Sequence, residues 1–299
     1  MIIGRRLAAA LDAAVSDAEA WPIGMLGFLV RGGIVVLALP ILTLPSPVGL
    51  ATILGPAVIS TGRLDGPLLS LLVLGGIALI AILAVALVLA AIAQQAIHVR
   101  WGLGLEGPAR VAVRRLSSVE LLALAPIAIA VLVTISGLVD DVRSELLLPG
   151  DLAVPLVVRV VARAAVPIGA LAAAIVVAEA IDGTLARRVL VHDRSSRGPG
   201  RSLWSIVATA SLGWIVTLVV LAPGLFVISA TWQRARAAWS QMARPEASAP
   251  DAVLAFVAAA VVVAVWLGLL LLCGVASIVR AHLWTSRVSV AGDWTDVGH

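Results

Sequence analysis

The feature that most constrains this chain is a series of long apolar segments, each able to cross a lipid bilayer as a helix. A bilayer core takes roughly 20 consecutive apolar residues. Hydrophobic residues make up 61% of the chain and charged residues 13%, which lies outside the range of soluble globular proteins. We therefore expect an all-α polytopic integral membrane protein with about six transmembrane helices plus amphipathic surface helices.

The predicted spans place residues 23–280 in one helical membrane domain. Their approximate bounds are 23–44, 68–97, 119–139, 154–181, 203–230 and 252–279. Residues 45–61 are also apolar, but Pro47 and Pro56 interrupt them. We expect this piece to be an interfacial or re-entrant segment instead of a seventh span.

Three further segments are predicted to lie outside the bilayer core. Residues 1–22 alternate apolar and charged side chains at helical spacing, which indicates an amphipathic interfacial helix that ends at Trp21-Pro22, although a frayed tail is the alternative. Residues 231–242 place two tryptophans on one helical face and suggest a second surface-lying helix. Residues 281–299 form a short cytoplasmic tail.

The distribution of arginine predicts the orientation. The chain has no Lys, Asn or Tyr, whose codons are AT-rich, so we infer a GC-rich bacterial genome and the cytoplasmic (inner) membrane. The predicted loops divide 13 arginines on one side from 5 on the other, which by the positive-inside rule places both termini in the cytoplasm. Membrane orientation thus explains the net charge of +4, and we expect no nucleic-acid partner.

Arg159 and Arg163 are the two cations of the fourth span. They are four residues apart and share a helix face, so they could clamp a lipid phosphate or an acidic solute. The alternative is that both side chains extend to the outer surface of the membrane or pair with the acidic loop at residues 140–151. Their helix face points away from the row of small residues Ala165, Gly169 and Ala173, which is typical of close helix packing and favours the second interpretation.

A second group of ionisable residues lies near the cytoplasmic ends of the spans. It comprises Arg31, Glu120, Glu179 and Asp182, which we expect to form an intramembrane network. A structural ion pair of Glu179 with Arg31 or Arg188 is one interpretation, and a carboxylate that couples to a proton or an ion is the other.

Metal and cofactor chemistry find little support in the sequence. His98, His192 and His282 all follow spans, but no pair of them has the spacing of metal ligands. The single cysteine, Cys273, lies in an apolar run. No complete catalytic motif is present, so we expect no catalytic residue, no metal and no cofactor.

Residues 179–187 read EAIDGTLAR. This run resembles the first half of the signature of CDP-alcohol phosphatidyltransferases, D-x-x-D-G-x-x-A-R, with Glu179 in place of the first Asp. The resemblance implies about six spans, an N-terminal surface helix and carboxylates that hold metal ions against a diphosphate. The second half of the signature needs two more acidic residues, and none follows Asp193 before the fifth span. In outline, the chain is also similar to uncharacterised families of bacterial six-span membrane proteins, which implies no activity.

These features lead us to expect a non-enzymatic membrane protein, either the membrane subunit of a larger complex or a handler of a lipid or small solute. The alternative is a secondary transporter or channel that uses the intramembrane Arg and Glu residues, and a metal-dependent lipid phosphotransferase comes third. The expected partners are the lipid bilayer and a membrane protein or a second copy of the chain.

Overall fold

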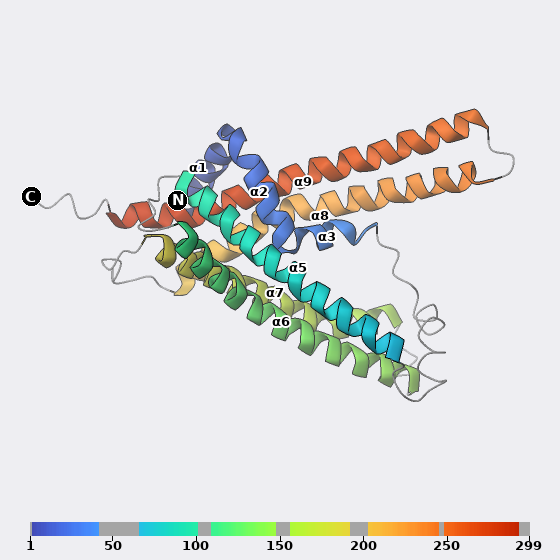
Figure 1. The fold of residues 1–299 in the computed structure, drawn as a ribbon, viewed down its shortest axis with the longest axis horizontal. Coiled ribbons are helices and arrows are strands. Elements are labelled where there is room, and N and C mark those ends of the chain that lie inside the picture. The colour runs from blue at the N-terminus through green and yellow to red at the C-terminus, as the bar shows by residue number, and fades with distance from the viewer. Residues whose placement is uncertain are drawn as a thin grey trace, which may run out of the picture. The chain divides into compact units, whose positions relative to one another are not determined.

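The computed structural model describes the backbone of residues 2–41, 66–100, 109–147, 156–191, 203–244 and 248–292 (Figure 1). Helices make up nearly all of these residues, and no strand occurs among them. Six helical stretches in the described ranges are long and apolar enough to cross a membrane. They are Ala18–Ala38, Val73–Arg100, Ala109–Thr134, Ala165–Ala186, Leu203–Met242 and Ala249–Thr285. The prediction of an all-α polytopic membrane protein is confirmed.

Five of the helices are much longer than a bilayer requires. They are α5 (Gly66–Arg100), α6 (Ala109–Leu147), α7 (Leu156–Val191), α8 (Leu203–Met242) and α9 (Ala249–Gly292). The shortest has 35 residues, against the roughly 20 that the hydrocarbon core needs. The helices continue through Pro126, Pro167 and Pro223 without ending. Residues 45–61 lie outside the described part of the chain.

The N-terminal region forms two helical segments. Helix α1 (Ile2–Ser16) lies where the amphipathic pattern predicts it and is followed by a 3-10 turn, η1 (Ala18–Ala20), and by α2 (Trp21–Phe28). We expected Trp21-Pro22 to end the first helix, but these residues open the second one. Proline is tolerated in a first helical turn because its missing N–H would have had no partner there.

The first predicted span is interrupted in its middle. Between α2 and α3 (Ile34–Ala38), the π-helical turn η2 (Leu29–Gly33) contains non-helical backbone at Arg31 and Gly32. Gly32 has a φ of 97°, a left-handed conformation that glycine adopts without a Cβ clash. The first span is therefore not one continuous helix, and Arg31 lies at the break.

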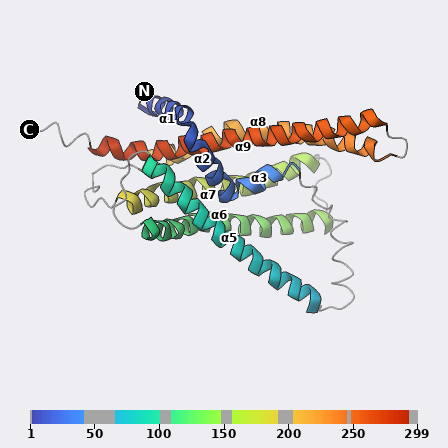
Figure 2. The same cartoon turned by 45° about the horizontal axis from the view of Figure 1, so that its top comes forward.

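The chain divides into two compact units, which we describe separately. Unit 1 comprises Met1–Ala18, Gln94–Thr217 and Ile278–His299. It contains α1, α6 and α7 with the adjoining ends of α5, α8 and α9. Helices α6 and α7 pack against each other as an antiparallel pair, as Figures 1 and 2 show.

Unit 2 comprises Glu19–Ala93 and Leu218–Ser277 and has an apolar core. The core joins α3, α8 and α9 through Leu37, Leu221, Ile228, Leu269, Leu270 and Cys273. Close helix contacts depend on glycines here. A Cβ at Gly224 would overlap the side chain of Leu269, and one at Gly274 would lie 2.9 Å from the backbone nitrogen of Met25.

Residues 231–242 do not form a separate helix. They are the last turns of α8, and Ala235, which shares a helical face with the two tryptophans, is only 1% exposed. The ring of Trp239 meets that of Phe256 on α9 edge to face, with centroids 5.8 Å apart. The expectation of a separate surface-lying helix is thus wrong, because these residues continue α8 and Trp239 contacts α9.

The contact between Gly274 and Met25 yields a test of this packing. We expect Gly274→Val to lower the free energy of unfolding by about 1–3 kcal/mol, because the added side chain overlaps Met25. Thermal unfolding of the purified protein in detergent measures the effect. Gly268→Val is the matched control on the same helix, since a Cβ at Gly268 meets nothing within 4 Å. Equal destabilisation by both variants would contradict this account.

Candidate functional site

The buried polar side chains of the described residues all belong to unit 1. We call the following set the polar cluster: Gln94, His98, Glu120, Glu179, Asp182, Thr217 and Thr285. They come from five helices. These are α6 and α7, the C-terminal ends of α5 and α9, and the N-terminal half of α8. Buried polar groups in an apolar setting are stable only when they are hydrogen-bonded, so their contacts indicate what the cluster can do.

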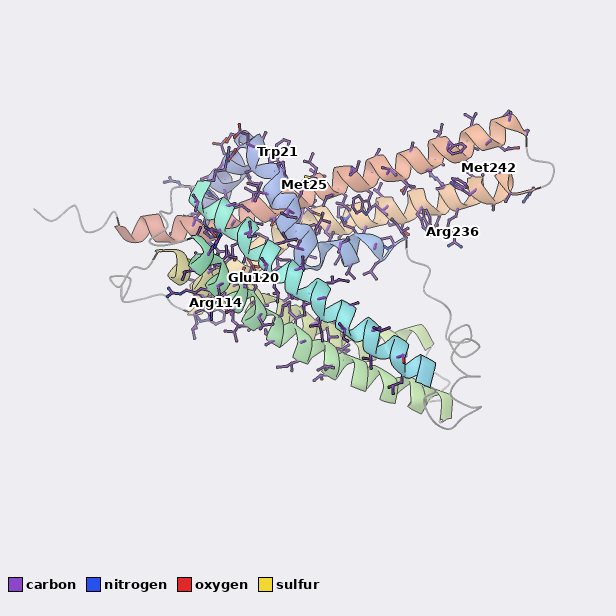
Figure 3. The ribbon with its side chains drawn as sticks, in the orientation of Figure 1. Trp21, Met25, Arg114, Glu120, Arg236 and Met242 are labelled. Carbon is purple, nitrogen blue, oxygen red and sulfur yellow. The ribbon has the colours of Figure 1, made fainter. Side chains whose placement is uncertain are left out.

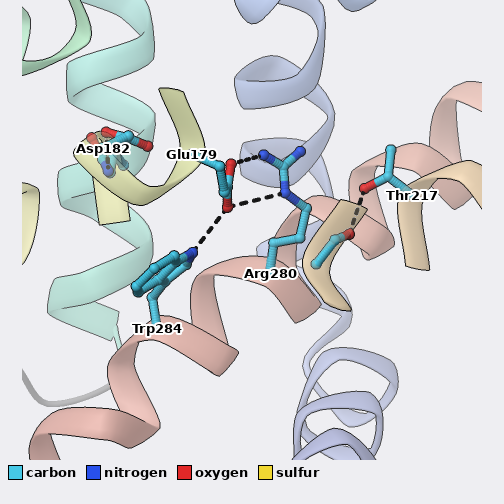
Figure 4. A network of polar contacts seen from close by, with 7 residues as sticks. Glu179, Asp182, Thr217, Arg280 and Trp284 are labelled. Atoms are coloured by element: carbon cyan, nitrogen blue, oxygen red, sulfur yellow. Dashed lines mark hydrogen bonds and ion pairs between the residues drawn. The ribbon is translucent and has the colours of Figure 1, made fainter. Parts of the chain in front are cut away.

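Glu179 on α7 contacts two residues of α9 (Figure 4). Arg280 on α9 forms an ion pair with its Oε2, and the Arg280 Nε donates to Oε1 at 3.4 Å. The indole Nε1 of Trp284 donates to the same Oε1 at 2.9 Å. Both carboxylate oxygens thus accept hydrogen bonds from α9, where Arg280 and Trp284 are one helical turn apart.

Arg280 is held on its other side by α8. A Cβ built on Gly213 would lie 3.0 Å from the Arg280 Cγ, so the arginine stem passes directly over this glycine. The guanidinium carbon lies 4.5 Å from the ring centroid of Trp214. A cation over an indole ring is stabilised by the ring's negative face, so α8 supplies a cation–π contact in addition to the ion pair.

Asp182 lies almost one turn beyond Glu179 on α7 and contacts α5. Gln94 Nε2 donates to Asp182 Oδ1 at 3.1 Å, and the ring Nδ1 of His98 donates to the backbone carbonyl of Gln94 at 2.7 Å. The side-chain oxygen of Gln94 is buried and has no hydrogen-bond partner among the described residues. Next to Asp182, Gly183 leaves room for Trp284, whose ring a Cβ would overlap.

Three of the four residues expected in the ionisable network are buried in unit 1. Glu120, Glu179 and Asp182 are all at most 8% exposed within unit 1. Arg31 belongs to unit 2, where its side chain is exposed at the break between α2 and α3. Arg280, which was not among the expected partners, forms an ion pair with Glu179.

The other predicted site residues are only partly described. Arg159 and Arg163 lie near the start of α7, but their side chains and that of Arg188 are outside the described part of the structure. His98 and His282 belong to unit 1, and His192 is outside the described residues. In the described ranges, no group of three or more His, Cys, Asp or Glu is placed to hold a metal ion.

The site residues predicted from the sequence did not include Gln94, Arg280 or Trp284. Arg280 was counted only as a cytoplasmic arginine, and Gln94 is a neutral residue at the end of an apolar run. The four-residue spacing from Gln94 to His98 and from Arg280 to Trp284 indicates that each pair shares one helix face. No sequence pattern indicates which residues of the other helices these side chains contact.

Residues of the half-signature EAIDGTLAR contact neighbouring helices in the structure. Glu179, Asp182 and Gly183 all lie within the continuous helix α7, and the two carboxylates contact α9 and α5, respectively. Packing against Trp284 accounts for the glycine. Each residue of the motif's acidic core therefore has a role in helix contacts.

Comparisons of the chain with protein-family models, with curated proteins and with solved structures find no match. The geometry of the polar cluster is therefore the basis for a functional proposal.

The burial of the Glu179–Arg280 pair predicts a large effect of its removal. We expect Glu179→Gln to lower the free energy of unfolding by about 3–5 kcal/mol, because Arg280 would keep a buried charge without its carboxylate. Chemical or thermal unfolding in detergent measures the loss.

The matched control is the more exposed ion pair that joins Asp17 to Arg100 in the same unit, with side chains 22% and 35% exposed. Asp17→Asn should lower the free energy of unfolding by about 1 kcal/mol or less, since exposed pairs are weak. The assignment is wrong if the two variants have equal effects.

Proposed function

We propose that this membrane protein is non-enzymatic and handles a small solute, which it binds at Gln94 and Asp182 of the polar cluster in unit 1. Under this proposal it is a multi-pass protein of a bacterial cytoplasmic membrane with both termini in the cytoplasm. The support comes from the burial of the cluster in helices that otherwise expose mainly apolar side chains. Ionisable and polar groups at such positions are costly, and a binding role explains why they are present.

The single observation that carries the proposal is the state of Gln94. Its amide nitrogen is engaged by Asp182, while its amide oxygen is buried without a partner among the described residues. A buried acceptor left unsatisfied costs about 1–3 kcal/mol. A solute that brings an N–H or O–H donor to this oxygen would recover that free energy.

The neighbouring group defines the class of solute. The side-chain carbonyl oxygen of Gln94 and the carboxylate of Asp182 are hydrogen-bond acceptors on neighbouring side chains. Two adjacent acceptors, one of them acidic, favour a ligand with several donors, such as a protonated amine or a polyhydroxyl compound. Anionic solutes are disfavoured at this position by the same charge.

The contacts of Glu179 have a different role in this proposal. Its oxygens are engaged by Arg280 and Trp284, so Glu179 is a positioning residue that fixes α7 against α9. Asp182 is on the same helix and is thereby held at a constant position opposite Gln94. A rigid frame of this kind reduces the ordering cost of binding a small ligand.

A ligand-induced stability measurement tests the proposal. Methylammonium chloride serves as the protonated amine, glycerol as the neutral hydroxyl compound, and sodium chloride as the salt control. We expect one of the first two to raise the unfolding temperature of the purified protein, since ligand binding to the folded state alone adds about 2.7 kcal/mol at 100 times its Kd. Gln94→Met should abolish the shift.

Thr217→Val is the matched control variant. Thr217 is buried in the same unit, but its hydroxyl donates only to the Gly213 carbonyl of its own helix at 3.1 Å. This variant should keep the ligand response. Solute binding at Gln94 is refuted if neither compound stabilises the native protein more than sodium chloride, or if Gln94→Met responds like the native protein. The membrane-subunit role then becomes the better supported one.

A further inference from the structure

The end of the α8–α9 hairpin in unit 2 exposes two different surfaces side by side. We define the hairpin tip as residues 231–244 of α8 and its C-terminal turn, together with residues 248–261 of α9. Its α8 side exposes polar and basic residues, namely Gln233, Arg234, Arg236, Ser240, Gln241 and Arg244. Its α9 side exposes the apolar residues Val253, Leu254, Phe256, Val257 and Val261.

The two surfaces lie at the same level along the hairpin. The contact between Trp239 and Phe256 fixes the register of the antiparallel helices, and Ala235 on α8 and Ala255 on α9 are both buried in the same stretch. Arg236 therefore lies at the same level along the hairpin as the turn of α9 that follows Phe256. The side chain of Phe256 is 64% exposed. Figure 3 shows Arg236 on the side of α8 that is turned away from α9.

Two arginines flank the packed row of α8. Arg234 and Arg236 immediately precede and follow Ala235, so they project on opposite sides of the contact with α9 at about 100° from it. Both are exposed, as is Arg244. None of the three forms an ion pair with another residue that the structure describes.

The described acid of the tip is already engaged. Asp251 accepts hydrogen bonds from the backbone N–H of Ser248 at 2.8 Å and from its hydroxyl at 2.6 Å, so it caps the start of α9. Between residues 231 and 244, the sequence contains no Asp or Glu. The α8 side of the tip therefore presents a positive charge of three arginines.

An apolar surface and a basic surface at the same level along the hairpin match the membrane–water interface. The exposed side chains of α9 favour the acyl region, whereas arginine side chains of this length reach the phosphates just above it. Guanidinium groups bind phosphate oxygens by paired, charge-assisted hydrogen bonds. We propose that the hairpin tip binds anionic phospholipid headgroups through Arg234, Arg236 and Arg244, with the apolar side of α9 inserted among the acyl chains. This site is independent of the polar cluster.

Native mass spectrometry of the full-length protein released from nanodiscs tests the assignment. The nanodiscs contain equal amounts of phosphatidylcholine and phosphatidylglycerol, and the retained lipids are counted. We expect preferential retention of phosphatidylglycerol by the native protein. In the variant Arg234→Gln/Arg236→Gln/Arg244→Gln, the affinity for it should fall by roughly tenfold or more, because each arginine near a membrane surface contributes to anionic lipid binding.

Two further variants and one soluble probe make the outcome decisive. Arg234→Lys/Arg236→Lys/Arg244→Lys keeps the charge and should retain most of the lipid. Arg110→Gln/Arg114→Gln/Arg115→Gln removes the same charge from exposed positions on α6 and should affect retention less. The proposal is overturned if the glutamine variant of the tip retains as much phosphatidylglycerol as the native protein, or if the α6 variant loses as much. Tight binding of inorganic phosphate to lipid-free protein would also overturn it, in favour of a soluble anion.

Discussion

The buried ion pair between Glu179 and Arg280 is the interaction on which the arrangement of unit 1 depends. An apolar environment offers few partners to a charge, so each charged group must find its counterpart within the protein. Arg280 meets this condition through Glu179 on α7 and the Trp214 ring on α8, while its stem packs on Gly213. Since α9 carries the cation and α7 the anion, the pair fixes the positions of the two helices along each other.

The two units illustrate different ways of holding apolar helices together. Unit 2 uses aliphatic side chains and glycines that permit close approach, as at Gly224 and Gly274. Unit 1 adds the buried polar cluster to such contacts. In a lipid environment, apolar faces do not distinguish strongly between a neighbouring helix and an acyl chain. Directional polar contacts therefore specify a single arrangement in unit 1, and they provide groups that a solute could use.

Several sequence predictions depended on which faces would remain uncovered. The row that includes Ala235 and Trp239 has the periodicity of a surface-lying helix, yet Ala235 is buried and Trp239 contacts Phe256 of α9. A helical wheel identifies an apolar face but does not say whether lipid or another helix meets it. Likewise, the non-helical backbone at Arg31 and Gly32 has only a Gly-Gly pair as its signal in the sequence, and that pair also occurs in unbroken helices such as α5 at Gly75 and Gly76.

The sequence by itself determined the fold class, the six spans and the burial of Glu179 near the end of a span, because these follow from local hydropathy and from the length of a bilayer crossing. Glu120 and Asp182 were recognisable for the same reason. Only the tertiary structure decided that Glu179 is held by Arg280 and Trp284, and that Gln94 contacts Asp182. These residues are about 90 to 105 positions apart in the chain, and long helices of similar hydropathy can pack in many arrangements. The specific pairs arise from the three-dimensional fit of glycines, rings and charges across those helices, which no local pattern contains.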